Sequence, residues 1–270
     1  MKNVLLLIHD DTGQEARLQT ALDLTRTLQG HLTCIDVTTV PAFVEGFGGP
    51  SGAAQMIFED DIAREKTNRA RMAKRLGDDE ISWVWIDVVG DLADSVLEQA
   101  LLADVIVVNR QLDASRHPDM VSIAKRILLH SRKPVIAVPE NLVRFAFERA
   151  LIAWDGSGAA AAAMCAAVPL LKLAAEVELL SVRTDPTTSS ALADLTDPAV
   201  YLSRYEVHPV IREEPSQGEN VTAVILEGAS EFAADYLVAG AYGHGMVHTA
   251  IGGVTRELLR SSEIPLFLAH

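Results

Sequence analysis

The sequence predicts an α/β fold made of two repeated, doubly wound domains, each with a five-stranded, mostly parallel sheet. Apolar runs of strand length alternate with segments of helical periodicity, as they do in α/β proteins. The alternation restarts near residue 149, and the two halves align with each other at constant offsets. These observations predict parallel strands joined by helices that cover both faces of each sheet.

The first half begins with a continuous apolar run, Asn3 to Ile8, which predicts a buried strand. The residues Asp10–Gly13 then supply turn and helix-capping chemistry before a helix from Glu15 to Gln29, which Gly30 ends. The same criteria predict, in order, a strand over His31–Val37, a loop over 41–52, a helix over Ala54–Leu76, a strand over Trp83–Val88, a helix over Leu92–Leu102, a strand over Asp104–Val108, a loop over Asn109–Met120, a helix over Val121–His130 and a strand over Pro134–Val138.

The second half repeats the first. Ala150–Ser157 matches Leu5–Thr12 at an offset of 145, and at this offset Val182 corresponds to Val37. Near the ends of the halves the offset is 131, because Asp235–Ala239 matches Asp104–Val108 and Ser262–Pro265 matches Ser131–Pro134. The difference, 145 − 131 = 14 residues, predicts extra material in the first half around its glycine-rich loop. We predict domains at 1–140 and 147–270, with the boundary within 139–148.

The composition excludes several classes of partner. The 270 residues include 23 basic and 37 acidic side chains, so the formal charge is −14. Nucleic acids and anionic membranes require a basic surface, and neither is an expected partner. The apolar start is too short for a signal peptide. Only Cys34 and Cys165 are present, and we expect each to be a small core residue in a reducing compartment. The expected location is the cytoplasm.

A glycine-rich stretch near the end predicts a phosphate site. Five of the 17 glycines lie between Gly240 and Gly253, after an apolar strand and before a helix that reaches Ser262. Glycines at such a junction let a ligand approach the backbone, and the N–H groups at the start of the helix attract phosphate. Thr255 adds a hydroxyl there. The alternative is a glycine-rich connection that binds nothing.

The first half lacks these glycines. At the 131 offset, Asn109 replaces Gly240, and Leu112 replaces Gly243. Side chains at such positions fill the space that a phosphate needs, so we predict a site in the second half only. Asp155 ends the first strand of that half and should lie near Gly240, because ligands of doubly wound sheets bind where the strand order reverses. Its carboxylate suits an adenine amino group or a ribose hydroxyl; capping the next helix is the alternative role.

Motifs for catalysis or metal binding are missing from the sequence. It has no Gly-x-Ser-x-Gly elbow, no Walker lysine pattern and no HExxH helix. His244 and His248 are four residues apart, but no third ligand has a suitable spacing. We therefore expect no catalytic residue and no metal ligand among the side chains.

Several of these segments together resemble the universal stress protein family, and two copies in one chain resemble its tandem members. They are Asp155-Gly-Ser157, the strand ending at Val182, Gly240-x-x-Gly243, Gly252-Gly253-Val-Thr255 and Ile264–Leu268. The resemblance implies an adenine nucleotide alpha hydrolase-like fold with five strands per domain and, in one subclass, ATP binding, with Mg²⁺ as a companion ion.

The resemblance also implies the site residues. Ala153, Asp155 and Val182 would hold the adenosine part of ATP. The phosphates would be held by Gly240, Gly243, Gly252, Gly253, Val254 and Thr255. The family pattern has nine residues between Gly-x-x-Gly and the next glycine. This sequence has eight up to Gly252 and nine up to Gly253, so two registers stay open.

Three functional hypotheses follow. The first is a tandem universal stress protein that binds one adenine nucleotide and serves in a stress response; its halves pair within the chain, and a homodimer is a further expectation. The second is an interaction or dimerisation module without nucleotide. The third is a small-molecule hydrolase or transferase that uses the same pocket. Binding is the expected activity of the first, with slow ATP hydrolysis at most.

Overall fold

The computed structural model describes residues 1–39, 52–112, 118–183, 195–216, 218–241 and 253–270, with backbone only over 52–62. The strands are β1 (Asn3–Ile8), β2 (His31–Thr38), β3 (Ser82–Val89), β4 (Val105–Asn109), β5 (Val135–Val138), β6 (Arg149–Ala153), β7 (Glu176–Arg183), β8 (Val210–Pro215), β9 (Tyr236–Gly240) and β10 (Leu266–Ala269). The helices are α1 (Gln14–Thr27), α2 (Gly52–Gly77), α3 (Leu92–Gln99), α4 (Met120–Ser131), α5 (Gly158–Leu171), α6 (Thr196–Ser203), α7 (Val221–Glu231) and α8 (Gly253–Ser261).

The α/β fold class is confirmed, and the predicted strands and helices of the first half are present with ends shifted by a few residues. The helix predicted over Leu92–Leu102 is α3 followed by a 3₁₀ turn, Ala100–Leu102. The loop predicted over 41–52 lies outside the described residues except Gly52, which begins α2. The described extra length of the first half lies in α2 itself, with 26 residues where α6 has eight.

All strands form one sheet, in the order β3-β2-β1-β4-β5-β10-β9-β6-β7-β8. The order within each half is the same, because β8, β7, β6, β9 and β10 repeat β3, β2, β1, β4 and β5. Neighbouring strands pair in parallel within each half. The sequence did not indicate that the two sheets are continuous.

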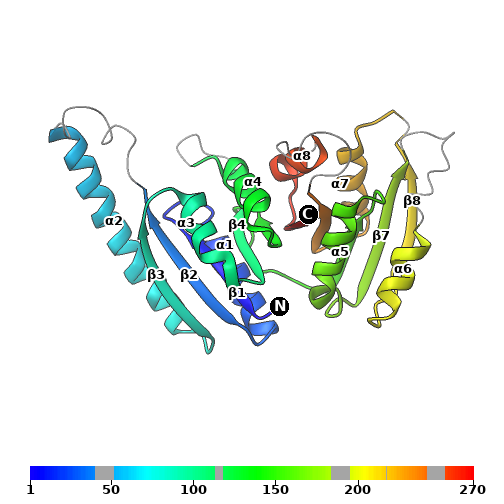
Figure 1. The fold of residues 1–270 in the computed structure, drawn as a ribbon, viewed down its shortest axis with the longest axis horizontal. Coiled ribbons are helices and arrows are strands. Elements are labelled where there is room, and N and C mark those ends of the chain that lie inside the picture. The colour runs from blue at the N-terminus through cyan, green and yellow to red at the C-terminus, as the bar shows by residue number, and fades with distance from the viewer. Residues whose placement is uncertain (40–51, 113–117, 184–194, 217, 242–252) are drawn as a thin grey trace.

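The halves join through one antiparallel pair, β5 with β10. Phe267 pairs with Ile136, Leu266 with Ala137 and Leu268 with Val135. At the 131 offset Phe267 is the counterpart of Ile136, so each strand pairs with its own repeat. A self-complementary contact of this kind relates the halves by an approximate two-fold axis. Figure 1 shows the consequence: α2 and α6 lie at opposite ends of the molecule, and α4 and α8 lie beside each other at the middle.

Two apolar layers cover the faces of the sheet. One layer packs α1, α2, α5 and α6 against one face. The other packs α3, α4, α7 and α8 against the opposite face. The strands near the middle of the sheet are buried on both faces, which explains their continuous apolar runs. Among the described residues, no helix has both the length and the apolar character needed to cross a membrane.

The cysteines behave differently from each other. Cys34 is buried in β2, as expected, and burial raises the pKa of its thiol to about 12. Cys165 is exposed, so its prediction as a core residue is wrong. It lies on α5, whose buried positions are mostly alanine, valine and leucine. The periodicity of a nearly uncharged helix does not show which small residues face the solvent.

The segment that links the halves, residues 139–148, packs into the core through Phe145. Phe145 is 2% exposed and packs edge-on against Phe147 and Tyr236, with ring centroids 4.8 and 5.6 Å away. Its backbone N–H donates to Asp23 Oδ2 on α1 at 3.0 Å. The linker thereby contacts an element of each half.

We expect Phe145→Ala to lower the free energy of unfolding by about 3–5 kcal/mol, because it removes a buried ring and leaves a cavity between the halves. Urea denaturation followed by circular dichroism measures the change. Val143 lies two residues away but is 85% exposed, so Val143→Ala should change the stability by less than about 0.5 kcal/mol. Similar decreases in the free energy of unfolding for the two variants would contradict the packing of Phe145 into the core.

Candidate functional site

A pocket lies at the carboxyl ends of β6 and β9. The chain runs from β6 through β7 to β8 on one side, and then returns to β9 on the other side of β6. The strand order therefore reverses between β6 and β9, which is where doubly wound sheets bind ligands. The described walls enclose about 150 Å³.

The predicted site residues meet at this pocket. Ala153 ends β6, Asp155 follows it, and Val182 lies near the end of β7. From the other side come Gly240, the last residue of β9, and the first turn of α8, Gly253–Thr255. Asp155 and Gly240 share the pocket although they are 85 residues apart, as the strand order predicts. Gly243 and Gly252 lie outside the described residues, as do His244 and His248.

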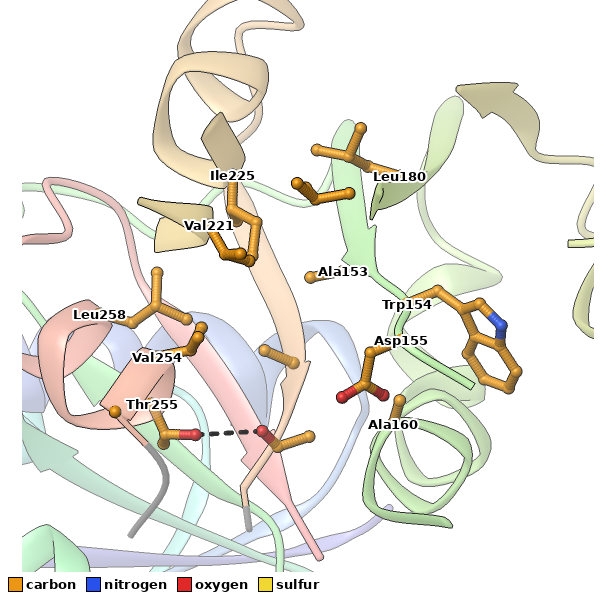
Figure 2. A pocket seen from close by; sticks show the side chains of 14 residues that line it. Ala153, Trp154, Asp155, Ala160, Leu180, Val221, Ile225, Val254, Thr255 and Leu258 are labelled. Carbon is orange, nitrogen blue, oxygen red and sulfur yellow. Dashed lines mark hydrogen bonds between the residues drawn. The ribbon is translucent and has the colours of Figure 1, made fainter. Parts of the chain in front are cut away.

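Sequence reasoning missed half of the lining. These residues are apolar and come from the position just after β6, from β7 and β9, and from the helices α5, α7 and α8. They are Trp154, Ala160, Leu180, Val221, Ile225, Ala239 and Leu258. Figure 2 shows Val221, Ile225, Leu180 and Leu258 around one end of the pocket, while the Trp154 ring points away from them. Spacing carries a weak signal for three of them: Leu180 shares a strand face with Val182, and Val221 and Ile225 are one helical turn apart.

Asp155 supports the turn between β6 and α5. Its Oδ1 accepts the N–H of Ser157 at 2.9 Å, and Gly156 adopts a positive φ of 77° in the same turn. The helix is capped by Ser157, whose Oγ accepts the N–H of Ala160 at 3.1 Å. Ser157 is therefore the residue that caps α5, and Asp155 positions Ser157 through the hydrogen bond to its N–H. The Asp155 carboxylate remains at the pocket wall.

Gly240 is needed for packing. A Cβ on Gly240 would lie 2.5 Å from the backbone nitrogen of Ala160 and 2.6 Å from the carbonyl carbon of Ala159. The start of α5 thus occupies the volume that a side chain would take at the end of β9. The sequence analysis attributed the glycine at this position to phosphate binding. In the structure, the absence of a side chain on Gly240 leaves room for the contact between α5 and β9.

Thr255 ties α8 to the sheet. Its hydroxyl is buried and donates to the carbonyl of Gly240 at 3.2 Å (Figure 2). This hydrogen bond places the first turn of α8 over the end of β9. Gly253 is different, because a Cβ there would meet nothing within 4 Å. Among the described glycines of the predicted motif, Gly253 is the one whose missing side chain leaves open space.

The corresponding place in the first half is filled by side chains. Asn109 stands where Gly240 stands in the second half and is fully buried. A Cβ on Gly13 would collide with the Asn109 side chain. Asn109 Nδ2 donates to the carbonyl of Val138 at 3.0 Å, and its Oδ1 accepts from Arg17.

The side chain of Arg17 also occupies this place in the first half, beside Asn109. The side chain is fully buried, and its Nη1 donates to Asp11 Oδ1 at 2.9 Å. Its Nε and Nη2 donate to the carbonyls of Leu7 and His9, both at 3.0 Å. A buried guanidinium is stable when its donors are paired in this way. The counterpart of Arg17 at the 145 offset is Ala162, so the second half has no arginine at the position from which this network is built.

Comparisons with known proteins agree with this fold. No protein-family model and no curated protein matches the chain. Among solved structures, a universal stress protein from Archaeoglobus fulgidus DSM 4304 superposes with a TM-score of 0.76 at 19% identity, over 99% of this chain and 95% of that one. The universal stress protein UspA from Lactobacillus plantarum is 18% identical, with a TM-score of 0.38 over 46% of this chain and 98% of that one. The first likeness shows that this chain has the fold of that universal stress protein over nearly its whole length.

We expect Gly240→Ala to destabilise the fold by about 1–3 kcal/mol, because the new methyl group meets backbone atoms that cannot rotate away. Gly253→Ala should change the stability by less than about 1 kcal/mol, since the same methyl group enters open space. Urea denaturation of both variants checks the difference. Equal effects would mean that α5 does not press on Gly240 in solution.

We expect Arg17→Met to cost about 3–5 kcal/mol, because it leaves the Asp11 carboxylate buried without its partner. Adding Asp11→Asn to this variant should recover part of the loss, since no buried charge then remains. Arg26→Met is the matched control, because the Arg26 side chain is half exposed. A cost for Arg17→Met no larger than for Arg26→Met would disprove the role of the buried network.

Proposed function

We propose that this chain is a tandem universal stress protein that binds one ATP in the pocket between β6 and β9. Its two domains are 1–140 and 147–270, and the site belongs to the second. The observation that carries the proposal is the position of the pocket at the switch point of the strand order, between a carboxylate and a helix N-terminus. Family membership and a role in stress response are part of the proposal.

The described walls suit a planar base. Ala153, Leu180 and Ile225 supply apolar surface, and Asp155 supplies an acceptor for an amino group or a ribose hydroxyl. Sites for whole ligands usually enclose roughly 300–1,000 Å³, whereas the described walls enclose about 150 Å³. In this proposal the described walls would hold the base, and the phosphates would extend beyond them.

The phosphates would extend toward the start of α8. The first N–H groups of a helix have no partner inside the helix, and the helix dipole favours negative charge there. The open space at Gly253 leaves room for phosphate oxygens at this end. Mg²⁺ would accompany the phosphates. The roles of Gly243 and Gly252 stay predictions, because they lie outside the described residues.

The first half supports the choice of a single site. Its switch point, between β1 and β4, contains the buried side chains of Arg17 and Asn109. A nucleotide could enter there only by displacing a network of paired polar groups, which is costly in a low-dielectric interior. The second half has alanine and glycine at the corresponding positions.

Binding is the proposed activity. Among the described lining residues, Asp155 is the only ionisable side chain, and no histidine, lysine or cysteine lies beside it in the pocket wall. A nucleophile paired with a general base needs two such groups in hydrogen-bond reach. The described wall therefore supports a nucleotide sensor better than a hydrolase.

We expect calorimetry with ATP and Mg²⁺ to give one site per chain. Gly253→Leu should weaken binding at least about tenfold, because its side chain would extend into the open space at the start of α8. Gly158→Leu is the matched control: Gly158 also begins a helix, and a Cβ there also meets nothing within 4 Å. It does not line the pocket, so its affinity should equal that of the unchanged protein.

Two sites per chain, or equal affinity in both leucine variants, would overturn the assignment of the site. No heat with any nucleotide would favour the interaction module. Product formation that Asp155→Ala abolishes would favour the enzyme.

A further inference from the structure

The carboxyl end of α8, in the second half, is held by residues of the first half. The N–H of Gln111 donates to the carbonyl of Leu259 at 2.9 Å, and Arg110 Nη1 donates to the carbonyl of Arg260 at 3.3 Å. The last four carbonyls of a helix have no partner inside the helix. Two of these carbonyls in α8 are therefore satisfied by residues that follow β4 in the other half.

The residues that reach α8 are themselves fixed. The N–H of Arg110 donates to the carbonyl of Val138 at 3.0 Å, and Asn109 Nδ2 donates to the same carbonyl at 3.0 Å. Asn109 in turn accepts a hydrogen bond from the buried Arg17. Leu112 is 4% exposed and lies in the apolar layer that contains α4 and α8. The contact with α8 thus comes from a segment that is anchored in the core of the first half.

The opposite end of α8 lines the pocket. Gly253, Val254 and Thr255 form the wall at its first turn, and Leu258 lines the pocket one turn further on. The helix has nine residues and is therefore about 13 Å long. Because so short a helix moves as one body, a displacement of its last turn also displaces the turn that faces the pocket.

The described hydrogen bonds from the second half reach the start and the middle of α8. Thr255, in the first turn, donates to the carbonyl of Gly240 at 3.2 Å. Asn220 Nδ2 donates to the carboxylate of Glu257 at 2.7 and 2.9 Å, and this contact is exposed to water, which competes for such bonds. The contacts from the first half therefore add support at the end of the helix.

Arg110 is suited to this place. The carbonyls at the end of a helix carry partial negative charge, so a cation beside them is favourable. The side chain is half-buried, and its Nη1 also donates to the carbonyl of Gln111 at 3.2 Å. At the 131 offset the counterpart of Arg110 is Ala241, and alanine has no side-chain donor. The second half therefore offers no equivalent side chain to α4.

We propose that Arg110 and Gln111 of the first half are positioning residues for the nucleotide site of the second half. By capping the end of α8 they hold its first turn at the pocket, where the phosphates would lie. This inference rests on the proposed function and gives the first half a part in it.

Arg110→Met tests the inference, because methionine keeps an apolar stem and loses the charge and the donors. We expect calorimetry to show that the affinity for ATP with Mg²⁺ falls about fivefold to tenfold. The affinity for adenosine should change less than about twofold, because adenosine has no phosphate to reach α8. A general loss of stability would weaken both ligands alike, so the ratio of the two affinities isolates the positioning role.

Two further variants complete this comparison. Arg110→Lys keeps the charge and a donor, so its affinity for ATP should stay within about threefold of that of the unchanged protein. Arg69→Met is the matched control, because Arg69 is half exposed and pairs with Asp87 on the edge strand β3. It should leave both affinities unchanged.

Amide hydrogen exchange of residues 253–261 without nucleotide measures the support of α8 directly. Arg110→Met should speed exchange there about fivefold and leave peptides from β6 unchanged. If the unchanged protein binds no ATP, the proposed function fails. If it binds ATP, an unchanged ratio of the ATP and adenosine affinities in Arg110→Met, or unchanged exchange in α8, would overturn the positioning role alone.

Discussion

The space between the end of the fourth strand and the start of the first helix in each half limits what that half can do. In the second half a Cβ on Gly240 would collide with the backbone of Ala159 and Ala160, and in the first half a Cβ on Gly13 would collide with the Asn109 side chain. The first half thus keeps a side chain, Asn109, at the end of its fourth strand, and this side chain fills the switch point between the central strands. The second half has glycine there, and its switch point is lined by small and apolar residues.

The pairing of β5 with β10 determines how the repeats combine. Because each strand meets its own counterpart, one contact satisfies an open edge of both halves and leaves β3 and β8 as the edges of the sheet. Both remaining edges carry charged side chains in ion pairs, Arg69 with Asp87 on β3 and Arg212 with Glu214 on β8. Charges on an edge strand disfavour pairing with further strands. The chain thus forms its two-fold contact between its own two halves, through β5 and β10.

The two halves share one fold, but the residues around their switch points differ in polarity. The second half surrounds its switch point with alanine, leucine and isoleucine, and adds one carboxylate and a helix N-terminus. The first half has buried polar contacts instead: Arg17 with Asp11 and Asn109, and His9 with Glu65. Apolar walls with few polar groups are typical of ligand pockets. Paired polar networks of this kind rigidify an interior and occupy the space that a ligand would need.

The sequence by itself determined the α/β class, the order of the elements and the repeat, because these follow from local periodicity and from identities at constant offsets. It also indicated the residues that share the pocket, since parallel strands place their carboxyl ends at one edge. Only the tertiary structure decided that β5 pairs with β10, that Leu180 and Ile225 complete the wall, and that Gly240 serves helix packing. Those features depend on which strand edges meet and on how side chains from distant segments pack, and the order of elements along the sequence does not specify either.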